Sequence, residues 1–257
     1  NNLIYKIAIT GNTIWMSHAK GIKSFDIATK KFTGYENLVD SNTCGRIAVL
    51  SDGKLLVNTW EHGLYIIDAV ANKVNHVLDH TICNDAAIVN IAGHNKLWVG
   101  TSQGLYTADI DKDILQITDK DFHLYKHDDR VPSSLSSDYI NCIYFDTSKD
   151  KSVWIGTGNG VNKLNPVYLQ FTSSAVTKDG KPFNTTSLFN VFTENNNGNS
   201  HYWLSYWHGT GLLQTNADFN IKKQIIVKDN NGNSTIVSKA LRGEFAARFK
   251  ASTISTS

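Results

Sequence analysis

Short apolar runs rich in β-branched and aromatic residues recur along the chain, and glycine, asparagine and aspartate stand between them. This arrangement is typical of short β-strands separated by turns. No long stretch places its apolar residues with the 3.6-residue period of an amphipathic helix. The pattern therefore predicts an all-β protein in which helix is nearly absent.

One phrase occurs five times: a bulky residue, a small polar triplet and a glycine, followed by another strand-like run. The bulky residues lie 41, 42, 56 and 49 residues apart, and the glycine follows each of them after six to eight residues. A turn of near-constant length inside a repeat of variable length is typical of a β-hairpin, because glycine supplies the positive φ that the turn needs. Repeats of this period indicate a β-propeller or a similar array. The phrases span 13–22, 54–64, 96–105, 152–161 and 201–212, and their bulky residues are Trp15, Leu56, Trp98, Trp154 and Trp203.

Each phrase lies between two further strand-like runs, so each unit contains four short strands, the make-up of one propeller blade. The runs before the phrases span 4–9, 46–50, 87–91, 139–145 and 187–192, and those after them span 31–35, 73–78, 122–127, 168–172 and 222–227. We therefore predict five four-stranded antiparallel blades in residues 1–228, with approximate limits 1–40, 41–80, 81–128, 129–175 and 176–228.

The segment 229–257 contains no further copy of the hairpin phrase. We expect it to be the start of a further blade or an irregular tail, either native or artificial. Propellers carry about four to eight blades, so five can close a ring. An arc of a larger ring would instead expose apolar blade faces and strand edges, which favours association.

Four of the bulky residues are tryptophans at one equivalent position per unit. Because tryptophan buries a large apolar surface, we expect these rings to fill the spaces between neighbouring sheets. Stacking of a ligand on these four rings is the alternative.

Composition and charge argue against nucleic-acid binding, a membrane span, a disulfide and a cysteine metal cluster. The chain has 257 residues with a net charge of +2 and no dense run of lysine and arginine, so it lacks the electrostatic footprint of nucleic-acid binding. It contains no apolar stretch long enough to cross a bilayer, no initiator methionine and no secretory signal pattern, so we expect Asn1 to begin a processed chain or a fragment. The three cysteines, Cys44, Cys83 and Cys142, fall at the first strand of different units, which predicts free, mostly buried thiols and neither a disulfide nor a metal cluster.

The stretch FHLYKHDDRVPSSLSSDYINCIYFD (122–146), followed by SVWIGTGNGVNKLN (152–165), resembles the two-component regulator propeller repeat. That repeat has an aromatic pair with His-Asp, a loop similar to Pro-Asn-Ser-Leu-Ser, a strand ending in aspartate and a Leu-Trp-Ile-Gly-Thr hairpin. The third and fourth units match closely. The match is looser at Met16-Ser17, at Leu56 and at Ser205-Tyr206, and it spans most of residues 1–228.

The resemblance implies a sensor role. Propellers of this family form the periplasmic part of hybrid two-component proteins, ahead of an immunoglobulin-like domain, a membrane helix and a histidine kinase with receiver and DNA-binding modules. Their usual ligand is an oligosaccharide, and their rings have about seven blades. The resemblance therefore implies a periplasmic segment that contacts the membrane only through downstream parts of the protein, and an arc of a larger ring.

No constellation of carboxylates, nucleophiles or metal ligands recurs on one rim, so we expect this segment to be neither an enzyme nor a cofactor-binding protein. His127, Asp128 and Asp129 precede a strand, where we expect them to satisfy the backbone of a turn rather than to act in catalysis or bind a metal. Two rival functions remain: a protein-interaction propeller without a small ligand and, less favoured, a polysaccharide lyase or hydrolase.

Two hairpin turns carry unusual residues. They are Thr59-Trp60-Glu61-His62-Gly63 and Tyr206-Trp207-His208-Gly209, whereas the turns of the third and fourth units carry Ser102-Gln103 and Gly158-Asn159. An exposed tryptophan beside polar residues suits the recognition of sugars. We therefore predict a recognition rim for an oligosaccharide, another small ligand, a second copy or a neighbouring propeller; residues 128–138 share this rim. In the alternative, both tryptophans fold back and only pack. The candidate residues are Trp60, Glu61, His62, Trp207 and His208.

Overall fold

A computed structural model describes residues 4–18, 20–35, 37–39, 44–91, 93–111, 113–146, 152–165, 170–174, 176–183, 188–196, 199–206 and 212–225, and all structural statements below concern these residues. They form five four-stranded antiparallel sheets, in each of which neighbouring strands follow one another in the sequence. The predicted all-β fold with five four-stranded blades is therefore confirmed. Within these ranges the helical structure consists of two 3-10 turns, η1 (Ile114–Gln116) and η2 (Asp119–Asp121), and no helix is long and apolar enough to span a membrane.

The blades are numbered in chain order. Blade 1 contains β1 (Ile4–Thr10), β2 (Thr13–His18), β3 (Gly21–Asp26) and β4 (Lys31–Gly34). Blade 2 contains β5 (Cys44–Val49), β6 (Leu55–Thr59), β7 (Leu64–Asp68) and β8 (Lys73–Val77). Blade 3 contains β9 (Cys83–Ile91), β10 (His94–Thr101), β11 (Gly104–Asp109) and β12 (Phe122–Tyr125). Blade 4 contains β13 (Ile140–Phe145), β14 (Val153–Thr157), β15 (Gly160–Asn165) and β16 (Gln170–Ser174). Blade 5 contains β19 (Leu188–Asn196), β20 (Asn199–Tyr206), β21 (Leu212–Thr215) and β22 (Ile221–Ile225), and the short pair β17 (Thr177–Lys178) and β18 (Lys181–Pro182) precedes it.

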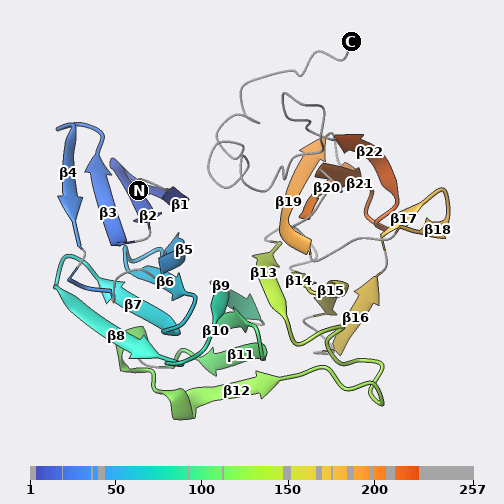
Figure 1. Cartoon of the computed structure of the whole chain (residues 1–257), viewed down its shortest axis with the longest axis horizontal. Coiled ribbons are helices and arrows are strands. Elements are labelled where there is room, and N and C mark those ends of the chain that lie inside the picture. The colour runs from blue at the N-terminus through green and yellow to red at the C-terminus, as the bar shows by residue number, and fades with distance from the viewer. Residues whose placement is uncertain are drawn as a thin grey trace.

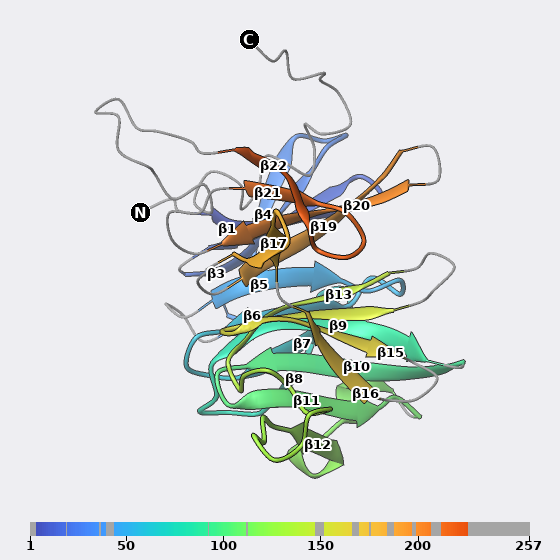
Figure 2. The same cartoon turned by 90° about the vertical axis from the view of Figure 1, so that its right-hand side faces the viewer.

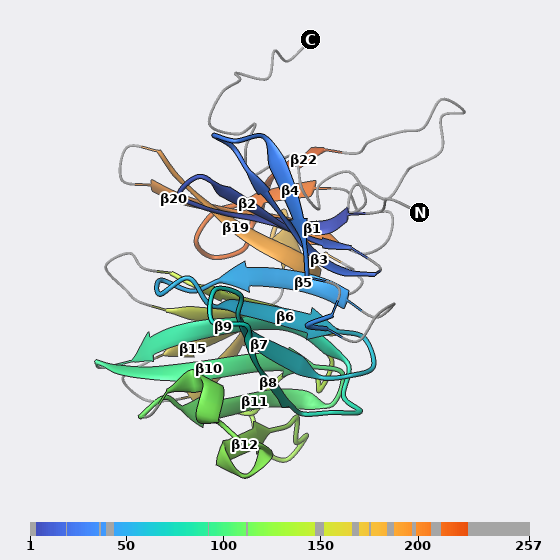
Figure 3. The same ribbon diagram turned by 90° about the vertical axis from the view of Figure 1, so that its left-hand side faces the viewer.

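The blades stand around a common centre, with the first strand of each blade innermost (Figure 1). Successive blades pack on one another, whereas blades 1 and 5 lie apart at the top of this view. The side views place the outer strands of blade 3 at the end of the molecule opposite to blades 1 and 5 (Figures 2 and 3). The five innermost strands β1, β5, β9, β13 and β19 therefore line the centre of the arrangement.

Three of the four repeated tryptophans pack between blades, as predicted. Trp15 lies in the cluster formed with blade 2, Trp98 in the cluster with blade 4, and Trp154 in the cluster with blade 5. Trp203 is also buried, and its indole N–H donates to Glu194 Oε2 at 2.7 Å. Truncation of a packed tryptophan to alanine typically costs about 3–5 kcal/mol, so Trp15, Trp98 and Trp154 contribute strongly to the packing of consecutive blades.

The residue two positions after the bulky residue also faces the next blade, and two kinds of contact occur there. Gly100 leaves no room for a side chain, because a Cβ would lie 2.6 Å from Ile140 Cγ2 of blade 4. In blade 1, Ser17 Oγ instead donates to the carbonyl of Gly45 in blade 2 at 2.6 Å. In blade 2, the amide oxygen of Asn58 accepts two backbone N–H groups of β9 at 2.8 and 3.0 Å. Consecutive blades are thus joined either by close approach or by a hydrogen bond.

Candidate functional site

One rim of the propeller collects the turns between the second and third strands and the connections between blades. Consecutive strands of a blade are antiparallel, so these segments leave the sheets at the same end. We call this the hairpin rim and define it by the turns 60–63, 102–103 and 158–159 and the connections 78–82 and 126–139. The expected recognition residues of blade 2 lie on it.

Trp60 spans the junction of blades 1 and 2 on the hairpin rim. Its ring packs edge-to-face on Tyr5 of β1, with 4.8 Å between the centroids and 74° between the planes. Its indole nitrogen also lies over Gly45 of β5, 3.2 Å from where a Cβ would stand. The side chain nevertheless remains 39% exposed. Trp60 therefore combines inter-blade packing with an aromatic surface open to solvent.

His62 belongs to a cluster of three histidines around Asp79, also on the hairpin rim. His62 Nδ1 lies 3.6 Å from Asp79 Oδ1, and the Nε2 atoms of His76 and His80 lie 3.7 and 3.5 Å from the same carboxylate. The pKa of Asp79 is lowered, first by a hydrogen bond from the backbone N–H of His80 and then by the neighbouring imidazoles. His76 also stacks on Tyr65 at 4.2 Å. This cluster was not predicted, because its members come from the 60–63 turn, β8 and the connection to β9.

Of the remaining candidates from the sequence, one lies beside Trp60 and two lie outside the described residues. Glu61 is exposed at the tip of the same turn as Trp60. Trp207 and His208 lie outside the described residues, so the second predicted turn cannot be placed beside the first.

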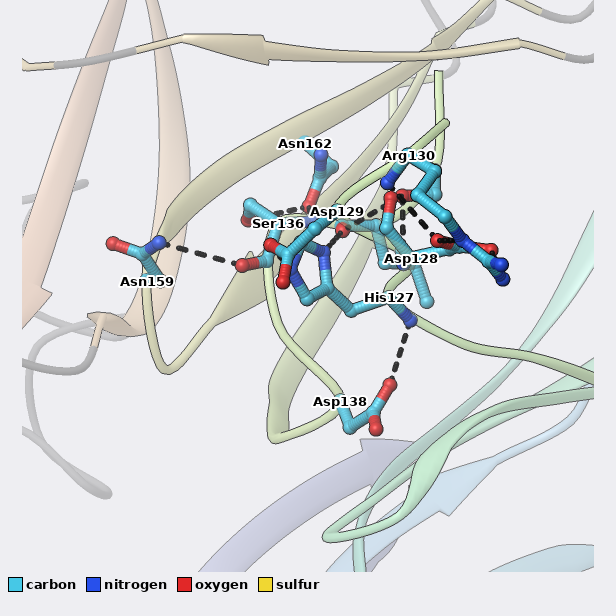
Figure 4. Close-up of polar contacts among 10 residues, drawn as sticks. His127, Asp128, Asp129, Arg130, Ser136, Asp138, Asn159 and Asn162 are labelled. Atoms are coloured by element: carbon cyan, nitrogen blue, oxygen red, sulfur yellow. Dashed lines mark hydrogen bonds and ion pairs between the residues drawn. The ribbon is translucent and has the colours of Figure 1, made fainter. Parts of the chain in front are cut away.

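The connection 126–139 carries the His-Asp and Pro-Ser-Ser-Leu motifs, and Figure 4 shows how His127 and Asp128 lie in it. The backbone N–H of His127 donates to Asp138 Oδ1 at 2.7 Å, and its ring Nε2 lies 2.8 Å from Asp129 Oδ1. The pKa of His127 is raised, first by the hydrogen bond of its ring to the Leu135 carbonyl and then by Asp129. Both ring nitrogens thus serve to fold the connection, as expected for a structural element.

The remaining polar groups of this connection are paired in the same way. Asp128 accepts from Arg130 Nε and Nη2 at 3.0 Å each, which lowers the pKa of Asp128. Ser136 Oγ contacts Asn162 Oδ1 at 2.8 Å and Thr157 Oγ1 at 2.9 Å, so the connection is tied to β14 and β15 (Figure 4). Within the described residues, no group of histidine, cysteine and acidic side chains is suited to hold a metal ion.

A second set of residues, at the centre of the propeller, has no counterpart among the sequence candidates. In every blade the pairing of the first two strands shifts register near the start of the first strand, as a β-bulge does. In four blades the shift ends at the residue that lies two positions before the strand partner of the bulky residue, and in blade 2 the shift includes this residue. We call these five equivalent residues the axial set: Lys6, Arg46, Asp85, Cys142 and Asn190.

At least four members of the axial set lie close to one another. Arg46 Nη1 of blade 2 lies 3.0 Å from Asp85 Oδ2 of blade 3, and the same oxygen accepts the backbone N–H of Ile143 in blade 4 at 2.9 Å. The charges of Arg46 and Asp85 act on the pKa values of Lys6 and Cys142. This set could not be recognised from the sequence, because the residue type differs in every unit. The five residues share only their position in the unit, and this shared position is recognised only when the units are aligned on the bulge.

Comparison with known proteins gives the fold. The sequence matches no family model, and no curated protein sequence gives a significant match. Among solved structures, the chain is similar to a protein of B. thetaiotaomicron described as the extracellular domain of a hybrid two-component system, with 20% identity and a TM-score of 0.65 over 91% of this chain and 30% of that one. It is also similar to PorZ, a surface component of the type-IX secretion system of Porphyromonas gingivalis, with 15% identity and a TM-score of 0.63 over 87% of this chain and 33% of that one.

A third similar structure is the virginiamycin B lyase of Staphylococcus aureus, with 13% identity and a TM-score of 0.61 over 89% of this chain and 72% of that one. The chain spans about a third of the length of the first two proteins. One propeller architecture thus serves a sensor, a secretion component and an enzyme, and at these identities the likeness shows the fold alone. The chain is a β-propeller of four-stranded antiparallel blades.

Proposed function

We propose that this chain is a ligand-sensing propeller segment of a two-component regulator and that it works outside the cytoplasm. The observation that carries the proposal is the motif of residues 122–165, in which a His-Asp and Ser-Ser-Leu connection precedes the Trp-Ile-Gly-Thr hairpin. Two findings support it. The connection is built as a structural element of the repeat, and one similar fold is described as the extracellular domain of a hybrid two-component system.

We propose further that the hairpin rim binds an oligosaccharide at Trp60. The ring packs in a T-shaped pair with Tyr5, and 39% of the residue remains exposed. Such a fixed aromatic surface can stack on the apolar face of a sugar, while neighbouring polar groups bind its hydroxyls. Glu61 and His62 follow Trp60 in the same turn and supply an acceptor and an imidazole.

Thermal unfolding in the presence of a panel of oligosaccharides tests this proposal, because a ligand that binds only the native state raises Tm. Trp60→Ala should abolish the Tm shift given by the best oligosaccharide, whereas Trp60→Phe should retain part of it. Phe32→Ala is the matched control, since Phe32 is a 67% exposed aromatic residue on the outermost strand of blade 1. A full Tm shift in Trp60→Ala would refute binding at this ring.

The second candidate function is a protein-interaction propeller, and one observation favours it. Ile4, Ile7 and Ile9 of β1 are 44%, 37% and 63% exposed. The positions of blade 3 that correspond to Ile7 and Ile9, Ala86 and Ile88, pack in the cluster between blades 2 and 3. Blade 1 thus presents apolar residues on a face that another blade or a second copy could cover. Light scattering distinguishes the two functions: a stable dimer, with no Tm shift across the oligosaccharide panel, would favour interaction.

A further inference from the structure

We propose that the axial set forms an anion site in which Lys6 and Arg46 bind the carboxylate or sulfate group of a small ligand. The inference concerns the centre of the propeller and goes beyond the sugar surface proposed at Trp60. It rests on the charges of the set, on the pairing of each charged group and on the position of the set beside Trp60.

The axial set carries an excess of one positive charge. Lys6 and Arg46 are cationic, and Asp85 is the one acidic member. Cys142 is a neutral thiol, because burial raises its pKa to about 12, and Asn190 carries an uncharged amide. Four blades contribute these charged and polarizable groups from equivalent positions on their innermost strands.

Asp85 already accepts three hydrogen bonds. Its Oδ2 accepts from Arg46 Nη1 at 3.0 Å and from the backbone N–H of Ile143 at 2.9 Å, while Oδ1 accepts from the N–H of Ala86 at 3.1 Å. The carboxylate therefore ties blades 2, 3 and 4 together. It pairs directly with Arg46 and its field also favours the charged form of Lys6, so one negative charge faces two positive charges.

Lys6 is the cation of the set for which the described part of the chain supplies no ion-pair partner. Its ammonium group makes no hydrogen bond or ion pair with any residue of the described ranges, although the side chain is half-buried. Its pKa is lowered, first by burial and then by the nearby charge of Arg46, and the charge of Asp85 offsets only part of this lowering. A lysine held close to an arginine in this way is destabilised by like-charge repulsion. An anion bound between the two cations would relieve this repulsion and gain charge-assisted hydrogen bonds.

The charged pair of the site reaches solvent at its edge and adjoins an aromatic surface. The side chains of Arg46 and Asp85 remain 14% and 18% exposed. Trp60 packs on Tyr5 and over Gly45, the residues immediately before Lys6 and Arg46. The five bulges at this level turn the side chains that follow them, as bulges do beside binding sites. One ligand could thus place a sugar ring on Trp60 and an acidic group on Lys6 and Arg46.

Three probes with one ring and different groups at carbon 6 test the inference: glucuronate, glucose 6-sulfate and glucose. At about ten times Kd, a bound anion should raise Tm by roughly 3–6 °C. We expect this shift from the carboxylate probe, the sulfate probe or both, and a much smaller shift from glucose. A response to only one of the acidic probes identifies which oxyanion the site prefers.

Lys6→Met is the decisive variant, because it keeps the aliphatic stem and removes the charge without touching the Arg46–Asp85 pair. It should abolish the anion-dependent Tm shift while leaving the Tm of the free protein unchanged or slightly higher. Lys73→Met, on the outermost strand of blade 2, is the matched control and should retain the full shift. An anion shift that persists in Lys6→Met, or the absence of a shift with both acidic probes in the wild type, would overturn the inference. Neutral oligosaccharide binding that depends on Trp60 would survive either result, so the two proposals fail separately.

Discussion

Gly100→Ala tests whether the glycine two positions after the packing tryptophan exists to let blade 4 approach blade 3. The new Cβ would lie 2.6 Å from Ile140 Cγ2 and 3.2 Å from Ile140 Cβ, whereas its distance to Ile143 Cδ1, 3.6 Å, is ordinary. Carbon atoms in contact normally stand about 3.5–4.0 Å apart, so the overlap with Cγ2 approaches 1 Å. The severe part of the clash therefore involves the Cγ2 methyl group of Ile140.

Ile140 cannot easily move away from this methyl group. It is fully buried at the start of β13, and its carbonyl accepts a hydrogen bond from Asn84 Nδ2 of blade 3 at 2.8 Å. Overpacking of this kind typically costs about 1–3 kcal/mol. Alanine also lowers the conformational entropy of the unfolded chain relative to glycine. This effect stabilises the folded state and offsets roughly 0.4–1 kcal/mol of the overpacking cost. We therefore expect Gly100→Ala to lower the free energy of unfolding by about 1–2 kcal/mol.

Urea unfolding of a double-mutant cycle with Ile140→Leu measures the clash itself. Leucine moves the branch from Cβ to Cγ and so removes the methyl group in question, at a cost of less than about 1.5 kcal/mol. Gly100→Ala should then cost much less in the Ile140→Leu background than in the wild type. An equal loss in both backgrounds, or no loss in either, would refute the explanation of Gly100 by close approach.

Three further predictions follow from individual residues. Gly63→Ala should lower the free energy of unfolding by roughly 3 kcal/mol in urea, because its Cβ would lie 2.3 Å from two backbone carbonyl oxygens. Gly11→Ala is the control: Gly11 has a φ of 54° but open space around it, so this variant should cost only about 1–2 kcal/mol. The raised pKa of His127 means that the folded state favours its protonated ring, so this contribution to stability is complete below the ordinary value of 6.5 and is lost as pH rises through the raised value. Wild-type Tm should therefore fall between about pH 6 and 8.5 more than the Tm of His127→Gln, and parallel curves would contradict this. The three thiols, whose pKa values burial raises to about 12, should resist a thiol reagent at pH 8 in the folded protein and all react after unfolding; rapid labelling of the folded protein would contradict their burial.

The prediction of the scaffold from sequence succeeded because its signals are local and repeated. Trp15, Trp98 and Trp154 recur at one position of each hairpin, and burial of a large ring between sheets is the same requirement in every blade. The three cysteines are free and buried, as their positions near the first strands predicted. Both inferences depend on the strand period and on the position within the unit, and both of these can be read directly from the order of residues in the chain.

The candidate site was harder to predict, because its contacts join different blades. Trp60 could be recognised as unusual from its turn, yet its packing on Tyr5 depends on how blades 1 and 2 meet. His62 could be selected in the same way, but its neighbours around Asp79 arrive from β8 and the connection beyond it. The positions of Trp207 and His208 stay a prediction, since they lie outside the described residues.

The sequence by itself determined the four-stranded unit, the number of its copies and the packing role of the tryptophan, because strand period, turn chemistry and apolar burial act over a few residues. Only the tertiary structure decided which side chains meet. Lys6, Arg46 and Asp85 lie about 40 residues apart in sequence and share no motif. They are brought together because every innermost strand bulges at the same level and all the innermost strands face one centre. The balance of charge at that centre is a property of the assembled blades and of no single repeat.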